Sequence, residues 1–167
     1  MNIRKANLQD FPELRRIYSA AREFMRTHGN PNQWGNRSPE EELLLRDIRG
    51  GKLYLVLDDG QRAVGAFALF TEPDPTYSYI EDGSWLSSAP YATIHSIASD
   101  GSTHGVLQTA VDFADGIYHH IRIDTHEDNT VMQTALKKRG FSRRGIIYLA
   151  NGDPRIAYER TEAAAAQ

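Results

Sequence analysis

A strand that runs through a short glycine-rich turn directly into a helix is the sequence feature that most restricts the fold. Residues 91–98, YATIHSIA, have the apolar and β-branched character of a buried strand, and apolar residues at helical spacing begin at Val106. The same order recurs downstream, where a strand at 120–124 precedes a helix from Asp128 to Gly140. Consecutive strand–helix units imply crossover connections and some parallel pairing of strands.

The rest of the chain predicts antiparallel strands and two more helices. These elements are a strand at 2–6, a helix from Asp10, a helix over 38–50, a hairpin within 52–70, and closing strands within 141–150 and 155–160. Asp10 and Glu13 have the spacing of a capping box. The predicted fold class is α/β (α+β in some schemes), a mixed sheet of about seven strands flanked by about four helices. One domain is expected over 1–160, with residues 161–167 as a flexible tail.

Composition narrows the classes of function. The 167 residues include no cysteine, which excludes disulfides and thiolate catalysis and suits a reducing, cytoplasmic compartment. The formal net charge is -3 and the basic residues are scattered, so no nucleic-acid partner is expected. No membrane segment or signal peptide is expected either, because no apolar stretch approaches roughly 20 residues and the first residues are polar. The six histidines contain no HxH or HxxxH pair, so no metal site is predicted.

The turn at 99–105 has the composition of an anion-binding site. A helix that begins after a glycine-rich turn presents free amides and the positive end of its dipole. Gly101 and Gly105 allow close approach of the backbone, and Ser102 and Thr103 add hydroxyl donors. A phosphate or pyrophosphate is the expected guest, and a capped turn without a ligand is the alternative. The run GSTHG is similar to a nucleophile elbow, but Thr103 stands at the position of the serine.

Several segments together resemble one family of enzymes. They are YATIHSIASDGSTHGVL (91–107), IRIDTHEDNTVMQTALKKRGF (121–141), the closing GIIY and RIAYER, and IRKANLQDFPELRRI near the start. They resemble the Gcn5-related N-acetyltransferases (GNAT), and the similarity covers nearly the whole chain. The resemblance implies a GNAT-like fold, acetyl-CoA as co-substrate and the amine of a small molecule or peptide as acceptor. Transfer would be direct, since no cysteine can carry the acyl group. A monomer or a homodimer is compatible with the sequence.

The resemblance also assigns the cofactor site. It implies that the backbone N–H of Ile97 contacts the thioester carbonyl and that Ala98 pairs with the pantetheine arm. Asn129 would contact the cofactor arm, and its alternative is a plain helix cap. The residues implied to hold the pyrophosphate are Gly101, Ser102, Thr103, His104, Gly105 and Val106. With the turn aligned on Gly105, Asp100 stands where the family usually has arginine or glutamine, and Thr103 where it has the first glycine.

His95 is the candidate general base. Strand alternation is expected to place its side chain on the same face as that of Ile97, and a histidine titrates near neutral pH. A buried, hydrogen-bonded histidine without a catalytic role is the alternative. Glu81 is also a candidate catalytic base, acting like Asp82 through water, and a solvated loop is the alternative for both.

The usual acid of the family is absent. Many members have a tyrosine seven residues after the asparagine, and this position holds Leu136. Tyr148 is a possible substitute, although packing in the core is the simpler expectation for it. The thiolate could also leave unaided, because a thiol has a pKa of about 8.5.

Aromatic residues in loops are expected to line the acceptor site. The candidate substrate-binding residues are Trp34, Tyr79 and Trp85, and scattered partial burial is the alternative. Two other functions stay open. One is an acyl-CoA-binding module of the same fold without turnover. The other is a hydrolase that uses Ser102 or Thr103 with His95 or His104.

Overall fold

Seven strands form one mixed sheet in the order β1-β2-β3-β4-β5-β7-β6 in the computed structural model, which describes residues 1–162. The strands are β1 (Asn2–Lys5), β2 (Leu53–Leu57), β3 (Ala63–Phe70), β4 (Ala92–Ser99), β5 (Ile121–Thr125), β6 (Ser142–Tyr148) and β7 (Pro154–Arg160). The helices are α1 (Phe11–Thr27), α2 (Glu41–Arg49), α3 (Val106–Asp115) and α4 (Thr130–Lys138), with short 3-10 turns η1 (Leu8–Asp10) and η2 (Pro75–Tyr77). The predicted mixed sheet with about four flanking helices is confirmed. The expected tail at 161–167 concerns residues that lie mostly outside the described range.

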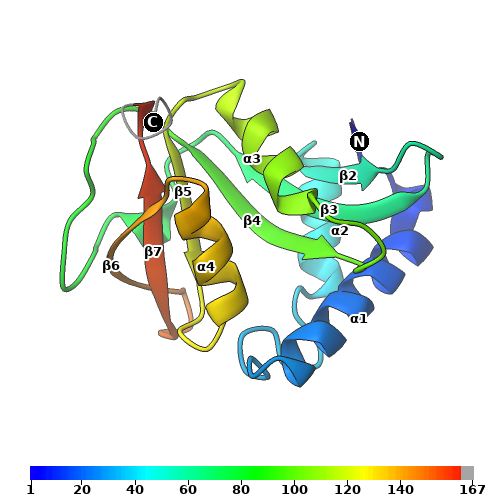
Figure 1. Ribbon diagram of the computed structural model, residues 1–167, viewed down its shortest axis with the longest axis horizontal. Helices are drawn as coiled ribbons and strands as arrows, with labels where there is room; N and C mark the ends of the chain where they lie inside the picture. The colour runs from blue at the N-terminus through cyan, green and yellow to red at the C-terminus, as the bar shows by residue number, and fades with distance from the viewer. Residues whose placement is uncertain (163–167) are drawn as a thin grey trace.

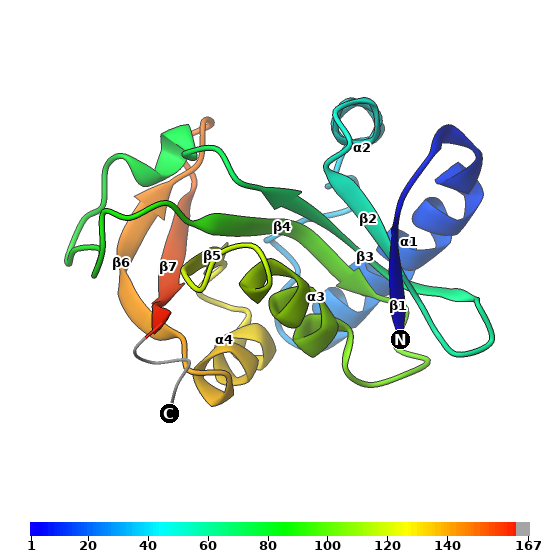
Figure 2. The ribbon, with the colours of Figure 1, turned by 90° about the horizontal axis from the view of Figure 1, so that it is seen from above.

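Helices cover both faces of the sheet, α1 and α2 on one side and α3 and α4 on the other (Figure 1, Figure 2). Each helix is amphipathic and buries one stripe of apolar side chains. One core cluster joins α3 and α4 to the sheet through residues such as Val106, Ala110 and Leu136. A second joins α1 and α2 to the opposite face through Leu14, Ile17 and others. The sheet is therefore buried on both sides over its central strands.

The parallel pair β4–β5 is short, and the two strands separate after it. The paired residues are Ala92 with Ile121 and Thr93 with Arg122, and no further pair joins the two strands within residues 1–162. Every other pair of neighbouring strands is antiparallel. The second half of β4 is therefore hydrogen-bonded to a strand on one side only.

A bulge in β4 lies at the point where the strands separate. Ala66 of β3 pairs with Ala98 and Ala68 pairs with His95, so Ser96 and Ile97 both lie opposite the single residue between them. Ser96 has φ of 52°, which is uncommon for a residue other than glycine.

The bulge changes which face each following side chain occupies. Ile94 and Ile97 both pack against the core under α3 and α4, whereas Ala98 belongs to the core under α1. The ring of His95 instead lies near Phe70 and Tyr77. The expectation that His95 and Ile97 share a face is therefore wrong, because the extra residue breaks the two-residue alternation.

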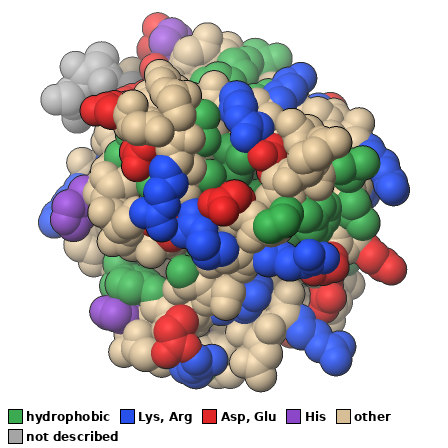
Figure 3. Space-filling view, turned by 90° about the vertical axis from the view of Figure 1, so that its right-hand side faces the viewer, with side chains coloured by type: hydrophobic (Ala, Val, Ile, Leu, Met, Phe, Trp, Pro, Cys, Tyr) green, Lys and Arg blue, Asp and Glu red, His purple; other side chains and the backbone are tan. Residues whose placement is uncertain are grey.

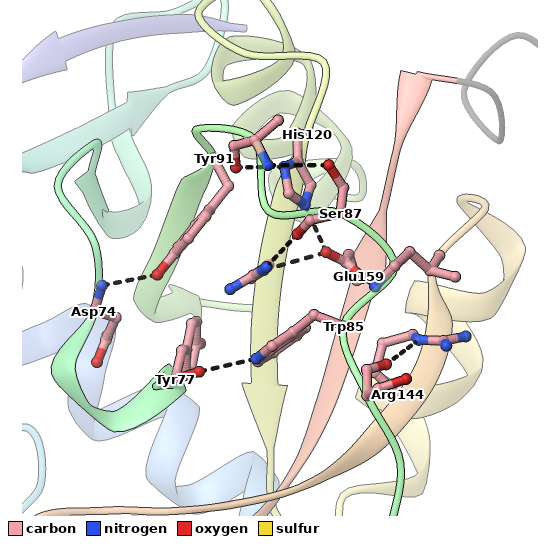
Figure 4. Close-up of polar contacts among 12 residues, drawn as sticks. Asp74, Tyr77, Trp85, Ser87, Tyr91, His120, Arg144 and Glu159 are labelled. Carbon is pink, nitrogen blue, oxygen red and sulfur yellow. Dashed lines mark hydrogen bonds and ion pairs between the residues drawn. The ribbon is translucent and has the colours of Figure 1, made fainter. Parts of the chain in front are cut away.

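The irregular aromatic segment 71–90 covers the β5–β7 part of the sheet. The guanidinium of Arg122 lies between the rings of Trp85 and Tyr91, at 4.0 and 4.1 Å from their centroids. Its Nε donates to Glu159 at 3.2 Å, and the same carboxylate contacts His120 Nε2 at 2.6 Å (Figure 4). Trp85 therefore anchors this segment to the sheet.

The start of α1 is fixed differently from the prediction. Asp10 makes no side-chain cap to α1. Its carboxylate accepts two hydrogen bonds from Arg4 and one from the N–H of Asn7, each 2.8 Å long. The predicted capping box of Asp10 with Glu13 is wrong, because the arginine of β1 competes successfully for the carboxylate.

The surface beside α1 carries charges of both signs. On the face that Figure 3 shows, Lys and Arg side chains are interspersed with Asp and Glu.

None of the helices within residues 1–162 combines the length and the apolar character that crossing a membrane requires.

Close approach of β3 to α3 depends on Gly65. A Cβ atom at this position would lie 2.6 Å from Val106 Cγ1 and 2.9 Å from the carbonyl oxygen of Ala98. We expect Gly65→Ala to lower the free energy of unfolding by about 1–3 kcal/mol, because the backbone must shift to relieve the overlap. Urea unfolding measures the change. Gly116→Ala is the matched control, since a Cβ there meets its nearest atom at an ordinary 3.4 Å. Equal loss of stability in both variants would contradict the prediction.

Candidate functional site

A cavity of about 680 Å³ lies where β4 and β5 separate. Its walls come from loop 32–40, α2, the ends of β3, β4 and β5, the start of α4 and loop 149–155. Four predicted site residues line it, namely Trp34, His95, Ile97 and Asn129. The sequence therefore identified residues that are far apart in the chain and that the fold brings into one cavity.

The backbone beside the bulge offers amides to the open side of β4. The N–H of Asp100 donates to the carbonyl of Val64 on β3 at 2.9 Å. Because backbone directions alternate along a strand, the amide of Ala98 also points toward β3, and those of Ile97 and Ser99 point away from it. The amide of Ser99, which the sequence analysis did not include, therefore points to the open side of β4, whereas that of Ala98 does not.

Tyr18 of α1 is hydrogen-bonded to the bulge in β4. Its hydroxyl donates to the carbonyl of Ser96 at 2.7 Å, and its ring packs edge-on against Trp34. Burial and the charge of Asp47 raise the pKa of Tyr18 far above its usual range, so the hydroxyl stays protonated as a donor. Helical periodicity showed Tyr18 only as an apolar-face residue, and nothing in its pattern indicated this hydrogen bond.

Two of the predicted amides at the turn already have acceptors within the turn. The N–H groups of Gly101 and Ser102 already donate to the side chains of Ser99 and Asp100, at 3.1 and 2.9 Å. Gly105 is the N-cap of α3 with φ of 97°, and no side chain caps the helix. The first helical bond runs from Thr109 N–H to Gly105 C=O, so within residues 1–162 the first-turn amides of residues 106–108 have no helical acceptor. These amides and the positive end of the helix dipole would favour an anion at this position.

Asp100 does not bring an unpaired charge to this turn. Its carboxylate lies 2.7 Å from Arg16 of α1 and 3.7 Å from Arg62, and the side chain is 3% exposed. Burial would raise the pKa of Asp100, but hydrogen bonds from Ser102 and Arg16 lower it below the usual range. The acidic residue at a position that is usually basic is thus compensated by two arginines.

His95 is part of a chain of polar groups that lines the cavity. Its Nε2 lies 2.7 Å from Asp74 Oδ2, and its Nδ1 lies 3.8 Å from Asp124 Oδ2. The hydroxyl of Tyr77 donates to Asp124 at 2.7 Å, and Thr76 donates to Asp74 at 2.6 Å. A neutral imidazole with its proton on Nε2, toward Asp74, leaves the Nδ1 lone pair without a hydrogen bond.

The charges around His95 favour its protonated form. Burial alone would lower the pKa of His95, but the hydrogen bond to Asp74 and the charges of Asp124, Asp74 and Asp47 raise it above 6.5. Burial would raise the pKa of Asp74, and its hydrogen bonds with His95 and Thr76 lower it to about 2. The pair is therefore a carboxylate beside an imidazole that keeps its proton to a higher pH than an unperturbed histidine does.

Gln33 connects the first loop to the end of β5. Its side-chain oxygen accepts hydrogen bonds from Asn129 Nδ2 at 2.9 Å and from Thr125 Oγ1 at 3.3 Å. The other side-chain atom of Asn129, Oδ1, accepts from the N–H of Met132 at 3.0 Å and caps α4. Arg155 fixes the same loop by donating to the carbonyl of Gln33 at 3.2 Å. Sequence reasoning missed Gln33, because no local pattern signals a contact across 96 residues.

Other predicted residues lie outside the cavity. Glu81 forms an isolated bridge with Ile146, and its carboxylate accepts a hydrogen bond from the hydroxyl of Tyr148. Tyr148 is 37% exposed rather than packed in the core, and Tyr79 is 63% exposed. None of these side chains, nor Asp82 or Trp85, belongs to the cavity walls.

The hydrolase alternative has no catalytic pair. The hydroxyl of Ser102 donates to Asp100, and that of Thr103 donates to the carbonyl of His104. Neither hydroxyl has a hydrogen bond to a histidine ring within the described part of the chain.

Leu136, at the position of the usual tyrosine acid, is fully buried in the core.

Comparison with known proteins gives matches at the level of structure. No family model and no curated protein matches the chain. A GNAT acetyltransferase from Streptococcus agalactiae is similar with a TM-score of 0.84 and 26% identity, over 96% of this chain and 94% of that one. Naa20 from Chaetomium thermophilum, solved with a bisubstrate analogue, matches with a TM-score of 0.65 and 12% identity, over 99% and 89%. A ribosomal-protein-alanine N-acetyltransferase from Brucella melitensis matches with a TM-score of 0.60 and 16% identity, over 96% and 99%.

The similarity to these neighbours extends over nearly the whole chain and is not confined to one segment. GNAT acetyltransferases from Listeria monocytogenes and Bacillus cereus match over 95% and 96% of this chain in the same way. The seven-stranded sheet and the similarity over nearly the whole chain show that the protein has the fold of the GNAT acetyltransferases.

Proposed function

We propose that the protein transfers an acetyl group from acetyl-CoA directly to a primary amine of a small molecule or peptide. The observation that carries this proposal is the open side of β4. A bulged strand presents unpaired amides there, between the anion site of α3 and the cavity that contains His95. A linear cofactor with an anionic end and a thioester end fits this arrangement.

The pyrophosphate of the cofactor would bind the first-turn amides of α3, where the helix dipole favours an anion. The pantetheine arm would pair with the backbone of Ser99 as an added strand does. The N–H of Ile97 would then donate to the thioester carbonyl and stabilise the oxyanion that forms on attack. Asn129, which caps α4 and lines the cavity, would contact the arm once its bond with Gln33 exchanges.

The chemical step needs an unprotonated amine. Its nitrogen attacks the thioester carbon, the C–S bond breaks, and the thiolate of CoA leaves. The amine proton passes to Nδ1 of His95, whose Nε2–H donates to Asp74. No tyrosine is among the cavity-lining residues of the described chain, so we propose that the thiolate leaves without a protein acid, as a thiol pKa of about 8.5 permits.

A negative charge placed at the α3 amides is expected to weaken cofactor binding. Gly105→Glu introduces a carboxylate at the N-cap, but its positive φ strains any side chain. Gln108→Glu places the charge in the first turn, where an acidic residue is compatible with the helix dipole. We expect both variants to weaken acetyl-CoA binding at least about tenfold in isothermal titration, which corresponds to 1.4 kcal/mol.

Gln9→Glu is the matched control, since Gln9 is exposed and lies outside the turn and the cavity. It should bind acetyl-CoA like the unmodified protein. Absence of binding to the unmodified protein at millimolar acetyl-CoA would refute the transferase. Binding without thiol release on any amine would instead favour an acyl-CoA-binding module.

The pH dependence of transfer is expected to follow His95. Only the neutral imidazole accepts a proton, and its pKa is raised, so kcat/KM should increase with pH through a value above 6.5. Asp74→Asn replaces the charged acceptor that raises this pKa by a neutral amide and should move the rising limb to lower pH. His95→Gln should lower kcat/KM by about 10²–10⁴-fold.

The comparison uses one amine throughout, so that its own ionisation affects every variant equally. The ring protons of His95, followed by NMR, report the same pKa without turnover. If the rising limb of the pH profile stays in place in Asp74→Asn while the pKa of His95 measured by NMR falls, His95 is not the base.

A further inference from the structure

The cavity wall contains more buried negative than positive charge around His95. Asp47 of α2, Asp74 and Asp124 of β5 line the cavity, and their side chains are only 4%, 15% and 9% exposed. Asp74 and Asp124 lie 2.7 and 3.8 Å from the ring nitrogens of His95, and Asp47 lines the same cavity. Among these four groups, ionisation of the three carboxyl groups leaves two negative charges in excess even with His95 protonated.

The arginines of the wall compensate this excess incompletely. The guanidinium of Arg155 donates to the carbonyls of Pro154 at 2.8 Å and Gln33 at 3.2 Å, so it binds backbone rather than a carboxylate. The side chain of Arg46 is 71% exposed and reaches only one oxygen of Asp47, at 3.4 Å. An exposed contact of this length contributes little.

Asp47 is the carboxylate without a close partner. Asp74 and Asp124 have bonds of 2.7 Å to His95 and Tyr77, but Oδ2 of Asp47 accepts no hydrogen bond within residues 1–162. Its burial raises the pKa of Asp47, which shows that the charged form is disfavoured as the cavity stands. A cation bound in the cavity would remove this penalty. Trp34 and Phe70 line the same cavity and add aromatic surface that favours a cation.

We propose that the acceptor is a diamine-like cation, which carries a second positive charge besides the amine that is acetylated. Asp47 binds this second ammonium group, while the reacting nitrogen faces His95 and Asp74. The inference rests on the proposed function, because it names the substrate class of the same site. The inference also assigns a role to Asp47. The sequence did not indicate this role, because Asp47 is one of several acidic residues in an amphipathic helix.

The test compares amines that differ only in the second charge. Thiol release is measured with 1,4-diaminobutane, butylamine and 4-aminobutanoate, in which the far end is an ammonium, a methyl or a carboxylate. The expected kcat/KM is at least about tenfold higher for the diamine than for butylamine, and lowest for the acid, as one charge contact in a desolvated site provides. Asp47→Asn, which keeps the shape and removes the charge, should reduce the diamine preference about tenfold.

Glu42→Gln is the matched control, because Glu42 lies on the same helix but is exposed and outside the cavity wall. It should retain the full preference. Binding of 1,4-diaminobutane in the absence of acetyl-CoA is measured in parallel by calorimetry, with thermal unfolding of each variant as the check on folding.

The outcomes separate the two proposals. Equal kcat/KM for the diamine and butylamine, or a preference that Asp47→Asn leaves intact, overturns the inference and leaves the acetyltransferase standing. Diamine binding that Asp47→Asn weakens, with no thiol release on any amine, supports the cation site and overturns the proposed function. A diamine that is neither bound nor acetylated overturns the inference outright.

Discussion

The early separation of β4 from β5 is the constraint on which the site depends. Two residue pairs join these strands, and the bulge at Ser96 and Ile97 begins three residues after the last of them. Unpaired strand backbone in the middle of a sheet is costly unless a partner satisfies it. Buried elements on both sides hold the arrangement in place. Tyr18 binds the carbonyl of Ser96 from α1, and Gly65 lets α3 approach closely enough to direct its N-terminus along the same opening. The gap is thus maintained by the packing of both helical layers.

Charges at the turn show how one local departure from a family pattern can be compensated at long range. Asp100 stands where a basic or amide side chain is usual, yet Arg16, 84 residues earlier in the chain, neutralises it. A pyrophosphate bound at this turn would then depend on backbone amides alone, which any residue except proline supplies. A side-chain pattern is therefore a poor guide to whether such a turn binds an anion, and the start of the helix is a better one.

The sequence predicted what depends on local periodicity and failed where contacts are distant. Strand alternation, helical spacing and the Asn129 cap gave the elements to within a few residues, and chain order gave the crossover between β4 and β5. The bulge escaped prediction, because a serine with positive φ leaves no signature, and the face of Ile97 was therefore assigned wrongly. Gln33 and Asp47 escaped it as well, since each acquires its role only when a loop or helix meets strands from the other half of the chain.

The two sides of the sheet offer opposite electrostatic environments to the two substrates. On the α3 side, free amides and a helix dipole favour an anion. On the side of α2, buried carboxylates favour a cation. An anionic cofactor and a cationic acceptor would each be disfavoured at the other's site, so the wrong arrangement is excluded by charge as well as by shape. The bulge is where both sites meet. Acetylation of the proposed diamine would turn one ionisable amine into a neutral amide, which would weaken the attraction of the product to the carboxylates and favour its release.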